Sequence, residues 1–524
     1  MNTLSRVTHL IDPVASFFDN RMNALLVREL RQLVRNRFII IMLNLYIGIL
    51  ALVCLLNVSF AADEYMYNNA SGVTLFYWIA GIMGTVGFLI VIPYTALVTA
   101  MERINNDLMF TSAIRPSSIV LGKFMNGLIL SLLLFSVTLP FFTVANQLRG
   151  LDMFTAIGNV WLTFLNLQLT IAVVILLFTA VRTYVQLVMM SIGAIIGSIM
   201  LLQGFFFMLA MRGGGFLFGG DYTWWGLLWM TLFYAILIAV FLSAAIINVA
   251  APTTNRFMPF RITTTLAFIF SFAVCAYLSF DLSAPDLMKT WSLVALWSLL
   301  PILLLTICDR DEYSPRLRNL LPRSPVYRFL IFPFHTGAVN GMLWASLLAV
   351  IIFLTSGLFI PEVFMTGSYT QDDYNVFFLI LFLFDYCFTA ILLQKWLLGR
   401  WIPRGMTWLL VGLLLTFFVT GGLLLHFVVE STSDNYGWAN YDESVFAATN
   451  PILLFNDFHQ EHRIQSLCAL VWAVALVPLI LIWAIPILWT FTPKMALQEH
   501  PNATDSADHS LPPSDSETAP PCDV

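Results

Sequence analysis

The chain has 524 residues, of which 59% are hydrophobic and only 10% are charged. A soluble domain usually carries charge on about a quarter of its residues, so the composition excludes a water-soluble globular protein. The net charge of −5 comes without any basic patch, and nucleic acid is therefore not an expected partner. Six cysteines are scattered singly along the chain, which excludes a disulfide framework and a paired metal-binding motif.

The first 37 residues form a segment of their own. Residues 1–37 carry charges throughout and lack the apolar core of a signal peptide. Within residues 21–37, apolar residues recur at helical spacing between basic ones, which predicts an amphipathic helix lying in the inner membrane surface. Such a helix serves either as a membrane anchor or also as a contact with a cytoplasmic partner. Its charged positions include Arg28, Glu29, Arg31 and Arg35.

About twelve apolar runs follow, each near the length that crosses a bilayer as a helix. Helices are expected because lipid offers no hydrogen-bond partners to an open backbone. The fold class is therefore an all-α polytopic membrane protein. The expected spans are residues 38–60, 74–98, 125–145, 157–180, 185–211 and 224–249, and then 262–278, 291–307, 338–359, 376–396, 406–428 and 468–489.

The distribution of basic residues predicts the orientation of these spans. With the N-terminus inside, 21 of the 25 lysines and arginines fall on the inner side. Such a bias follows the positive-inside rule and places both termini in the cytoplasm. Beyond the last span, the tail at 491–524 is rich in Ser, Asp and Pro, which predicts disorder.

No P-loop occurs in the sequence. The nearest approach is Gly122-Lys123, where Ser117 takes the place of the first glycine and Phe124 follows the lysine. A P-loop needs both glycines, because backbone amides must cradle the phosphates while the lysine reaches them. The chain is therefore not expected to be an enzyme, and we expect no catalytic residues and no bound cofactor. His459 and His462 fit no zinc-protease spacing, so no metal site is expected.

The cytoplasmic loop after the second span, residues 101–123, has a distinctive pattern. A residue before proline avoids the helical region, so the pattern predicts a short helix, a break at Arg115-Pro116 and a new helix capped by Ser117 or Ser118. A short, polar, proline-broken element suits docking onto a soluble protein, although an ordinary connecting loop would look similar. The residues that carry the pattern are Glu102, Arg103, Leu108, Thr111, Arg115, Pro116, Gly122 and Lys123.

This loop resembles that of the ABC type-2 permease family, the membrane subunits of many bacterial ABC exporters. The resemblance extends over roughly residues 21–261 and includes Asn255-Arg256 after the sixth span. It implies that the loop couples the chain to a separate cytoplasmic ATPase subunit, which binds the ATP. It also implies a bacterial cytoplasmic (inner) membrane, a second permease copy or a related permease as partner, membrane lipid around it and a transported substrate that the sequence does not identify.

The resemblance also suggests a division of the chain. No second copy of the loop occurs in the later spans, so they form a separate region. The expected parts are a cytoplasmic N-terminus with the interfacial helix at 1–37, a six-helix permease-like membrane domain at 38–261, a second six-helix membrane region at 262–490 and a cytoplasmic tail at 491–524.

Two other functions are compatible with the sequence. Asp385 is essentially the one acidic residue in the middle of a span, and such groups often serve ion-coupled carriers. A carboxyl hydrogen-bonded inside the bundle is the simpler explanation of the same residue. A membrane-embedded transferase would instead use acidic residues of the outer loops, such as Asp442 and Glu443.

Overall fold

The computed structural model describes a helical protein. Each regular element of the described residues is a helix, and ten of these helices are long and apolar enough to cross a membrane. The chain is therefore a multi-pass, all-α membrane protein. The described residues are 37–63, 71–104, 115–147, 153–181, 186–193, 197, 224–251, 254–281, 286–309, 317–318, 321–322, 324–359, 371–402, 406–422, 424, 428, 449–450 and 463–491.

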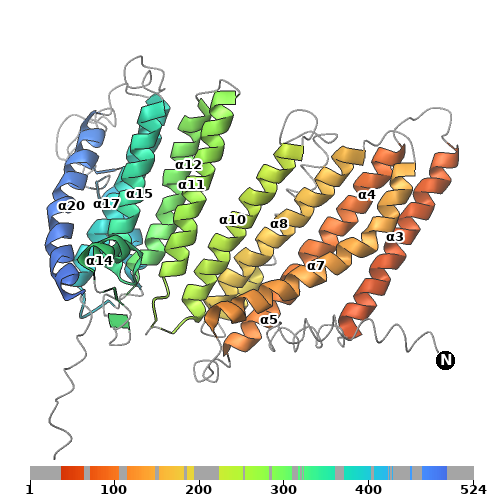
Figure 1. Ribbon diagram of the computed structural model, residues 1–524, viewed down its shortest axis with the longest axis horizontal. Coiled ribbons are helices and arrows are strands. Elements are labelled where there is room, and N and C mark those ends of the chain that lie inside the picture. Colours follow the sequence, from red (N-terminus) through yellow and green to blue (C-terminus); the bar gives the residue numbers. More distant parts are fainter. Residues whose placement is uncertain are drawn as a thin grey trace, which may run out of the picture.

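The first half of the chain forms the helices on the right of Figure 1. A π-helical segment, η1, joins α4 to α5 without a break, so that these three elements make one long crossing. The elements are α3 (Arg37–Asp63), α4 (Ser71–Val86), η1 (Gly87–Val91), α5 (Ile92–Ile104), α7 (Pro116–Gln147), α8 (Met153–Thr179) and α10 (Trp224–Val249).

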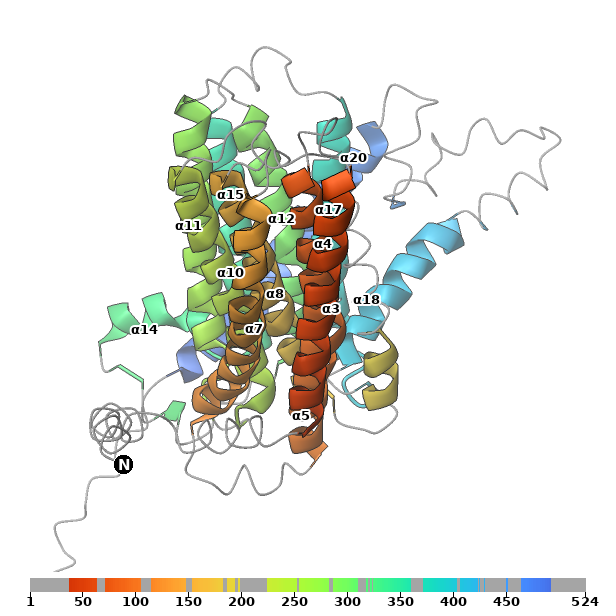
Figure 2. The ribbon, with the colours of Figure 1, turned by 90° about the vertical axis from the view of Figure 1, so that its right-hand side faces the viewer.

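The second half forms the helices on the left of Figure 1. Figure 2 shows that the short α14 lies across the direction of the long helices, and that α18 leans away from them. The elements are α11 (Met258–Asp281), α12 (Asp286–Ile307), α14 (Pro325–Ile331), η2 (Phe332–Phe334), α15 (Ala338–Phe359), α17 (Gln371–Trp396), α18 (Thr407–Thr416), the π-helical η4 (Phe417–Gly421) and α20 (Arg463–Thr490).

Ten of the twelve expected spans coincide with the ten membrane-length helices. The expected span at 406–428 contains the shorter apolar helix Thr407–Gly421. The expected span at 185–211 lies mostly outside the described residues, although 186–193 are helical. The interfacial helix and nearly all of the tail also lie outside them, so these features and the total of twelve stay predictions.

The third span differs from its expected start. The helix α7 already begins at Pro116 rather than near residue 125, and Ser117 and Ser118 lie inside its first turn. Neither serine is therefore the cap that the sequence suggested. Proline suits the first helical position because its missing N–H has no partner there in any case and its φ is already helical. The expected span covered only the more strongly apolar part of this helix.

Two pairs of neighbouring helices run parallel. Along α8 and α10, Trp161 bonds Thr231 (2.8 Å) and Tyr234 donates to Asn166 (2.7 Å), so both helices advance in the same direction. Along α17 and α20, Trp472 donates to Thr389 (3.0 Å). Farther along both, Lys395 lies over the ring of Trp483, at 4.0 Å. Two parallel helices begin at the same end of the bundle, so the chain must run back to that end between them. The predicted spans at 185–211 and 406–428 would provide these two returns.

Two large apolar cores hold the structure together. One joins α3, α4, η1, α5, α7, α8 and α10, and the other joins α12, α15, α17, α18 and α20. The helix α11 packs against both α10 and α12, yet only 6% of its membrane window is buried inside the protein. It therefore connects the two halves, and few of its residues are fully buried inside the protein.

Candidate functional site

The predicted coupling segment connects two long helices at one end of the bundle. Glu102 and Arg103 belong to the last turn of α5, and the exposed Arg115 immediately precedes α7. The amide of Ser118 donates to the Arg115 carbonyl at 3.0 Å, which closes the first turn of α7. Some of the predicted site residues lie outside the described part of the chain. They are Leu108 and Thr111 of this segment and Arg28, Glu29, Arg31 and Arg35 of the predicted interfacial helix.

The last two residues of the segment lie inside the bundle. Gly122 and Lys123 are buried in α7, and only 5% of Lys123 is exposed. A soluble partner could touch Arg115 and Pro116 at the helix start, but not these two residues in the conformation described. Gly122 and Lys123 can therefore influence a partner only through the way in which α7 packs.

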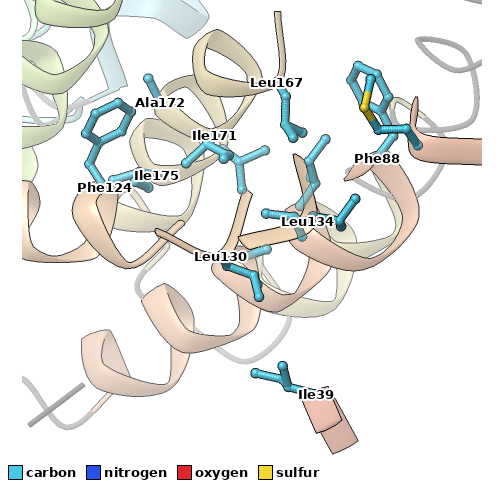
Figure 3. Packing of buried hydrophobic residues seen from close by; sticks show 14 of the residues in the cluster. Ile39, Phe88, Phe124, Leu130, Leu134, Leu167, Ile171, Ala172 and Ile175 are labelled. Carbon is cyan, nitrogen blue, oxygen red and sulfur yellow. The ribbon is translucent and has the colours of Figure 1, made fainter. Parts of the chain in front are cut away.

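Close packing joins α7 to both α5 and α8. A Cβ on Gly127 would lie 3.0 Å from Cγ2 of Thr95 on α5 and 3.0 Å from Cγ2 of Ile171 on α8. Figure 3 shows Leu130 and Leu134 of α7 among side chains of α8 in the same core. Because packed interiors resist compression, a displacement at the lower ends of α5 and α7 must be shared by α8.

The π-helical segment η1 lies in the middle of this packing. Pro93 follows it and has no N–H, so the usual hydrogen bond to the carbonyl four residues earlier cannot form. The helix widens to a π turn over Gly87–Val91 just before the proline. A Cβ on Gly87 would lie 3.2 Å from Leu167 of α8. The second crossing therefore has a built-in irregularity at its contact with α8.

A cluster of polar groups joins the two halves at the end where α5, α8 and α10 end, which is the lower end in Figure 1. Asp309, just beyond α12, is buried, and its carboxylate accepts bonds from Arg256 (2.5 Å) and from the Gly337 amide (2.7 Å). The Asn255 side chain accepts a bond from the amide of Thr336 at 3.1 Å. We call the set of Asn255, Arg256, Arg261, Asp309 and residues 333–337 the polar clasp.

Arg261, in the first turn of α11, is the most buried member of the polar clasp, with 0% of its surface exposed. Its guanidinium donates to the carbonyls of Pro333 (2.8 Å), His335 and Gly337 (3.1 Å). Gly337 has φ 129°, a conformation that favours glycine. A single side chain thus satisfies three carbonyls of the connection that leads into α15.

Only part of the polar clasp was predictable from the sequence. Asn255-Arg256 belongs to the family resemblance, whereas the charges of the segment from Cys308 to Arg328 are typical of a solvated linker or of a second contact with the ATPase. Asp309 instead bonds inside the protein, and Pro325–Ile331 form α14. The carbonyl acceptors were missed because backbone groups leave no mark in the sequence.

His335 gives the polar clasp a dependence on pH. Burial lowers the pKa of its imidazole from the ordinary 6.5, the hydrogen bond to the Ile331 carbonyl opposes this, and the charge of Arg261 lowers the pKa further. The imidazole therefore binds a proton more readily in the unfolded chain than in the folded protein. The neutral ring contributes fully to stability above the ordinary pKa of 6.5, and this contribution is lost as the pH falls below that value. We expect the melting temperature in detergent to fall between about pH 8 and about pH 5.5.

The contribution of His335 can be separated from that of other titrating groups by the variant His335→Asn. This side chain does not titrate in the range, so the melting temperature should depend less on pH than in the unchanged protein. An identical pH dependence in the two proteins would show that His335 does not contribute. Thermal unfolding followed by tryptophan fluorescence measures both.

Asp385 lies far along the chain from the coupling segment, in the apolar core of the second half. It belongs to the membrane window Phe377–Trp396 of α17 and is 1% exposed. The described residues contain no group of three or more His, Cys, Asp or Glu side chains that could hold a metal ion. Asp385 and the coupling segment are therefore separate candidate sites.

No family model matches the chain, and no curated protein or solved structure matches it. The helices by themselves identify a multi-pass membrane protein. The pattern of residues 101–123, and the packing of the helices that this segment connects, carry the assignment that follows.

Proposed function

We propose that this chain is the membrane-spanning permease subunit of an ATP-driven ABC transporter. The supporting observation is that the motif-bearing segment connects α5 and α7, and that Gly127 joins α7 to α5 and α8 at close approach. A cytoplasmic ATPase subunit would contact the segment from Glu102 to Pro116 and bind the ATP, because this sequence contains no P-loop.

Coupling would work by displacement of packed helices. Closure of the ATPase subunits on ATP would push the segment, and α5, α7 and α8 would shift together because they approach closely at Gly127. Small shifts of packed helices of this kind are a common switching movement. The η1 irregularity beside Leu167 gives the second crossing a place to adjust.

The same assignment implies a location, an orientation and partners for the chain. The chain would lie in the cytoplasmic (inner) membrane of a bacterium, with both termini and the coupling segment in the cytoplasm. It would work with a second copy or a related permease and would act as an exporter. The polar clasp would carry the movement of the first half to α12 and α15 through Arg256 and Arg261.

Substitution of Arg115 by alanine tests the assignment most directly. Arg115 is exposed at the start of α7, so its loss should leave the helix packing and the melting temperature unchanged. We expect the Arg115→Ala protein, and likewise Glu102→Ala, to lose the ATPase subunit that co-purifies with the unchanged protein, and to lose transport. The measurement is a pull-down in mild detergent with identification of stoichiometric partners.

Arg400→Ala is the matched control, because Arg400 is also an exposed arginine after a membrane span but lies outside the coupling segment. It should retain the ATPase. If the unchanged protein purifies without any P-loop ATPase and is active alone, the permease assignment is wrong. If the ATPase is retained by Arg115→Ala and Glu102→Ala, the contact lies elsewhere.

A further inference from the structure

Asp385 lies in the interior of the second half of the chain. It belongs to the membrane window Phe377–Trp396 and exposes 1% of its surface. An ionised carboxyl in the middle of a membrane is costly, and where acidic residues occur there they usually pair with another group. The surroundings of this carboxyl therefore decide its charge.

The direction of the side chain follows from the pairing of α17 with α20. Thr389, one turn after Asp385, accepts a hydrogen bond from Trp472 of α20 at 3.0 Å. Residues four apart share a face of a helix, so Asp385 faces α20 one turn before Trp472, where Cys468 lies. Asp385 is also close enough to Cys468 to interact with it electrostatically.

No described residue neutralises this carboxyl. Its Oδ2 is buried and has no hydrogen-bond partner within the described part of the chain. The membrane window of α12 and the shorter apolar helix Thr407–Gly421, which contains α18, contain no ionisable residue, and α12 and α18 both pack against α17. The lysine of α17, Lys395, lies over the ring of Trp483 at 4.0 Å and is about 15 Å farther along the helix.

The groups around Asp385 that can titrate are weak acids, which cannot balance a negative charge. They are Cys468 on α20 and Tyr386 and Cys387 on α17, with Cys308, just after α12, interacting with Cys387. A buried carboxylate without a counter-charge costs far more free energy than the neutral acid. Protonation removes that cost with no further ligand, whereas a metal ion would need several oxygen atoms.

The next residue helps to close the site. The Tyr386 hydroxyl donates to the carbonyl of Thr449 at 2.6 Å, which brings a part of the connection before α20 against α17. The Tyr386 ring also stacks on Phe418 of η4 (5.7 Å) and meets Trp472 edge-on (5.3 Å). A π-helical segment in an aromatic cluster is a local irregularity of the kind often found at functional sites.

We propose that the Asp385 carboxyl is a proton-binding site at the interface of α17 and α20, occupied by a proton at neutral pH and able to exchange it with water. The second half of the chain would then bind protons while the first half couples to the ATPase. The exchange is a reversible transfer of one proton between the carboxyl and water, without any other reactant. It is independent of the proposed permease role, since the site contains no part of the coupling segment.

Labelling with dicyclohexylcarbodiimide tests the site, because this apolar reagent modifies protonated carboxyls within membranes. The full chain, reconstituted in phosphatidylcholine nanodiscs, would be labelled over a series of pH values and mapped by peptide mass spectrometry. We expect labelling of Asp385 at neutral pH that declines at alkaline pH, and no labelling of Asp385→Asn. Labelling that sodium ions suppress at constant pH would indicate a metal site and overturn the proton assignment.

A second measurement does not depend on access of the reagent. Infrared spectra should contain the C=O stretch of a protonated carboxyl, which Asp385→Asn removes. If this band is absent at neutral pH, the carboxyl is ionised and the proposal is wrong. The variant Arg463→Gln tests the basic residue at the start of α20: labelling of Asp385 that appears only in this variant would show an ion pair and also overturn the proposal.

Discussion

Replacing Arg261 by methionine should lower the free energy of unfolding by about 3 to 5 kcal/mol. Methionine fills much of the same volume, but it leaves the carbonyls of Pro333, His335 and Gly337 buried without their donor. Buried polar groups without a partner cost the full loss of their hydration. Unfolding in mixed detergent micelles, followed by tryptophan fluorescence, measures the change.

Two further variants serve as comparisons for Arg261→Met. Arg261→Lys keeps the charge, but its ammonium is a compact point charge and cannot reach all three carbonyls. This variant should therefore recover only part of the lost free energy of unfolding. Arg400→Met removes an exposed arginine and should change the free energy of unfolding by less than about 0.5 kcal/mol. If Arg261→Met unfolds like Arg400→Met, the polar clasp does not stabilise the protein.

Replacing Gly341 by valine should cost about 1 to 3 kcal/mol. A Cβ at this position would lie 2.7 Å from Cβ of Thr306 on α12 and 2.8 Å from Nη2 of Arg261. The first contact is with a branched side chain held by its own helix, so α12 and α15 must move apart. Unfolding followed by tryptophan fluorescence measures this change as well, and we expect the melting temperature to be lower.

Gly412→Val is the matched control for this helix glycine, because a Cβ on Gly412 meets nothing within 4 Å. It should have little effect on unfolding. The double variant Arg261→Met with Gly341→Val should lose less stability than the sum of the single variants, since one of the two clashes involves the arginine. Full additivity would show that Gly341 and Arg261 do not share a contact.

Hydropathy predicted the helices because membrane spans depend on the length of an apolar run. The helices Trp224–Val249 and Ala338–Phe359 have the predicted bounds. The helix α7 begins earlier than predicted because a helix can extend beyond the membrane, and the polar residues of its first turns hide this. The expected spans at 262–278 and 291–307 were short, and the helices that contain them, α11 and α12, have 24 and 22 residues and are long and apolar enough to cross a membrane.

The candidate sites were predictable to different degrees. The sequence placed Asp385 in mid-membrane, and the structure adds the face on which it lies and the absence of a described partner for its Oδ2. The polar clasp could not be predicted, because Arg261 bonds carbonyls 72 to 76 residues away in the chain. Long-range contacts with backbone atoms depend on how helices meet, which no local pattern records.

The position of the polar clasp at one end has a mechanical consequence. The polar clasp joins the two halves where α10 ends and α11 begins, and a rotation of one half against the other about this point, as a pivot, would leave these bonds in place. The 24 residues of α11 span about 36 Å. A tilt of about 10° about that pivot would move its far end by about 6 Å, while the pivot end stays in place. A small change of angle at the polar clasp would therefore become a displacement of side-chain size at the opposite end of the helix bundle.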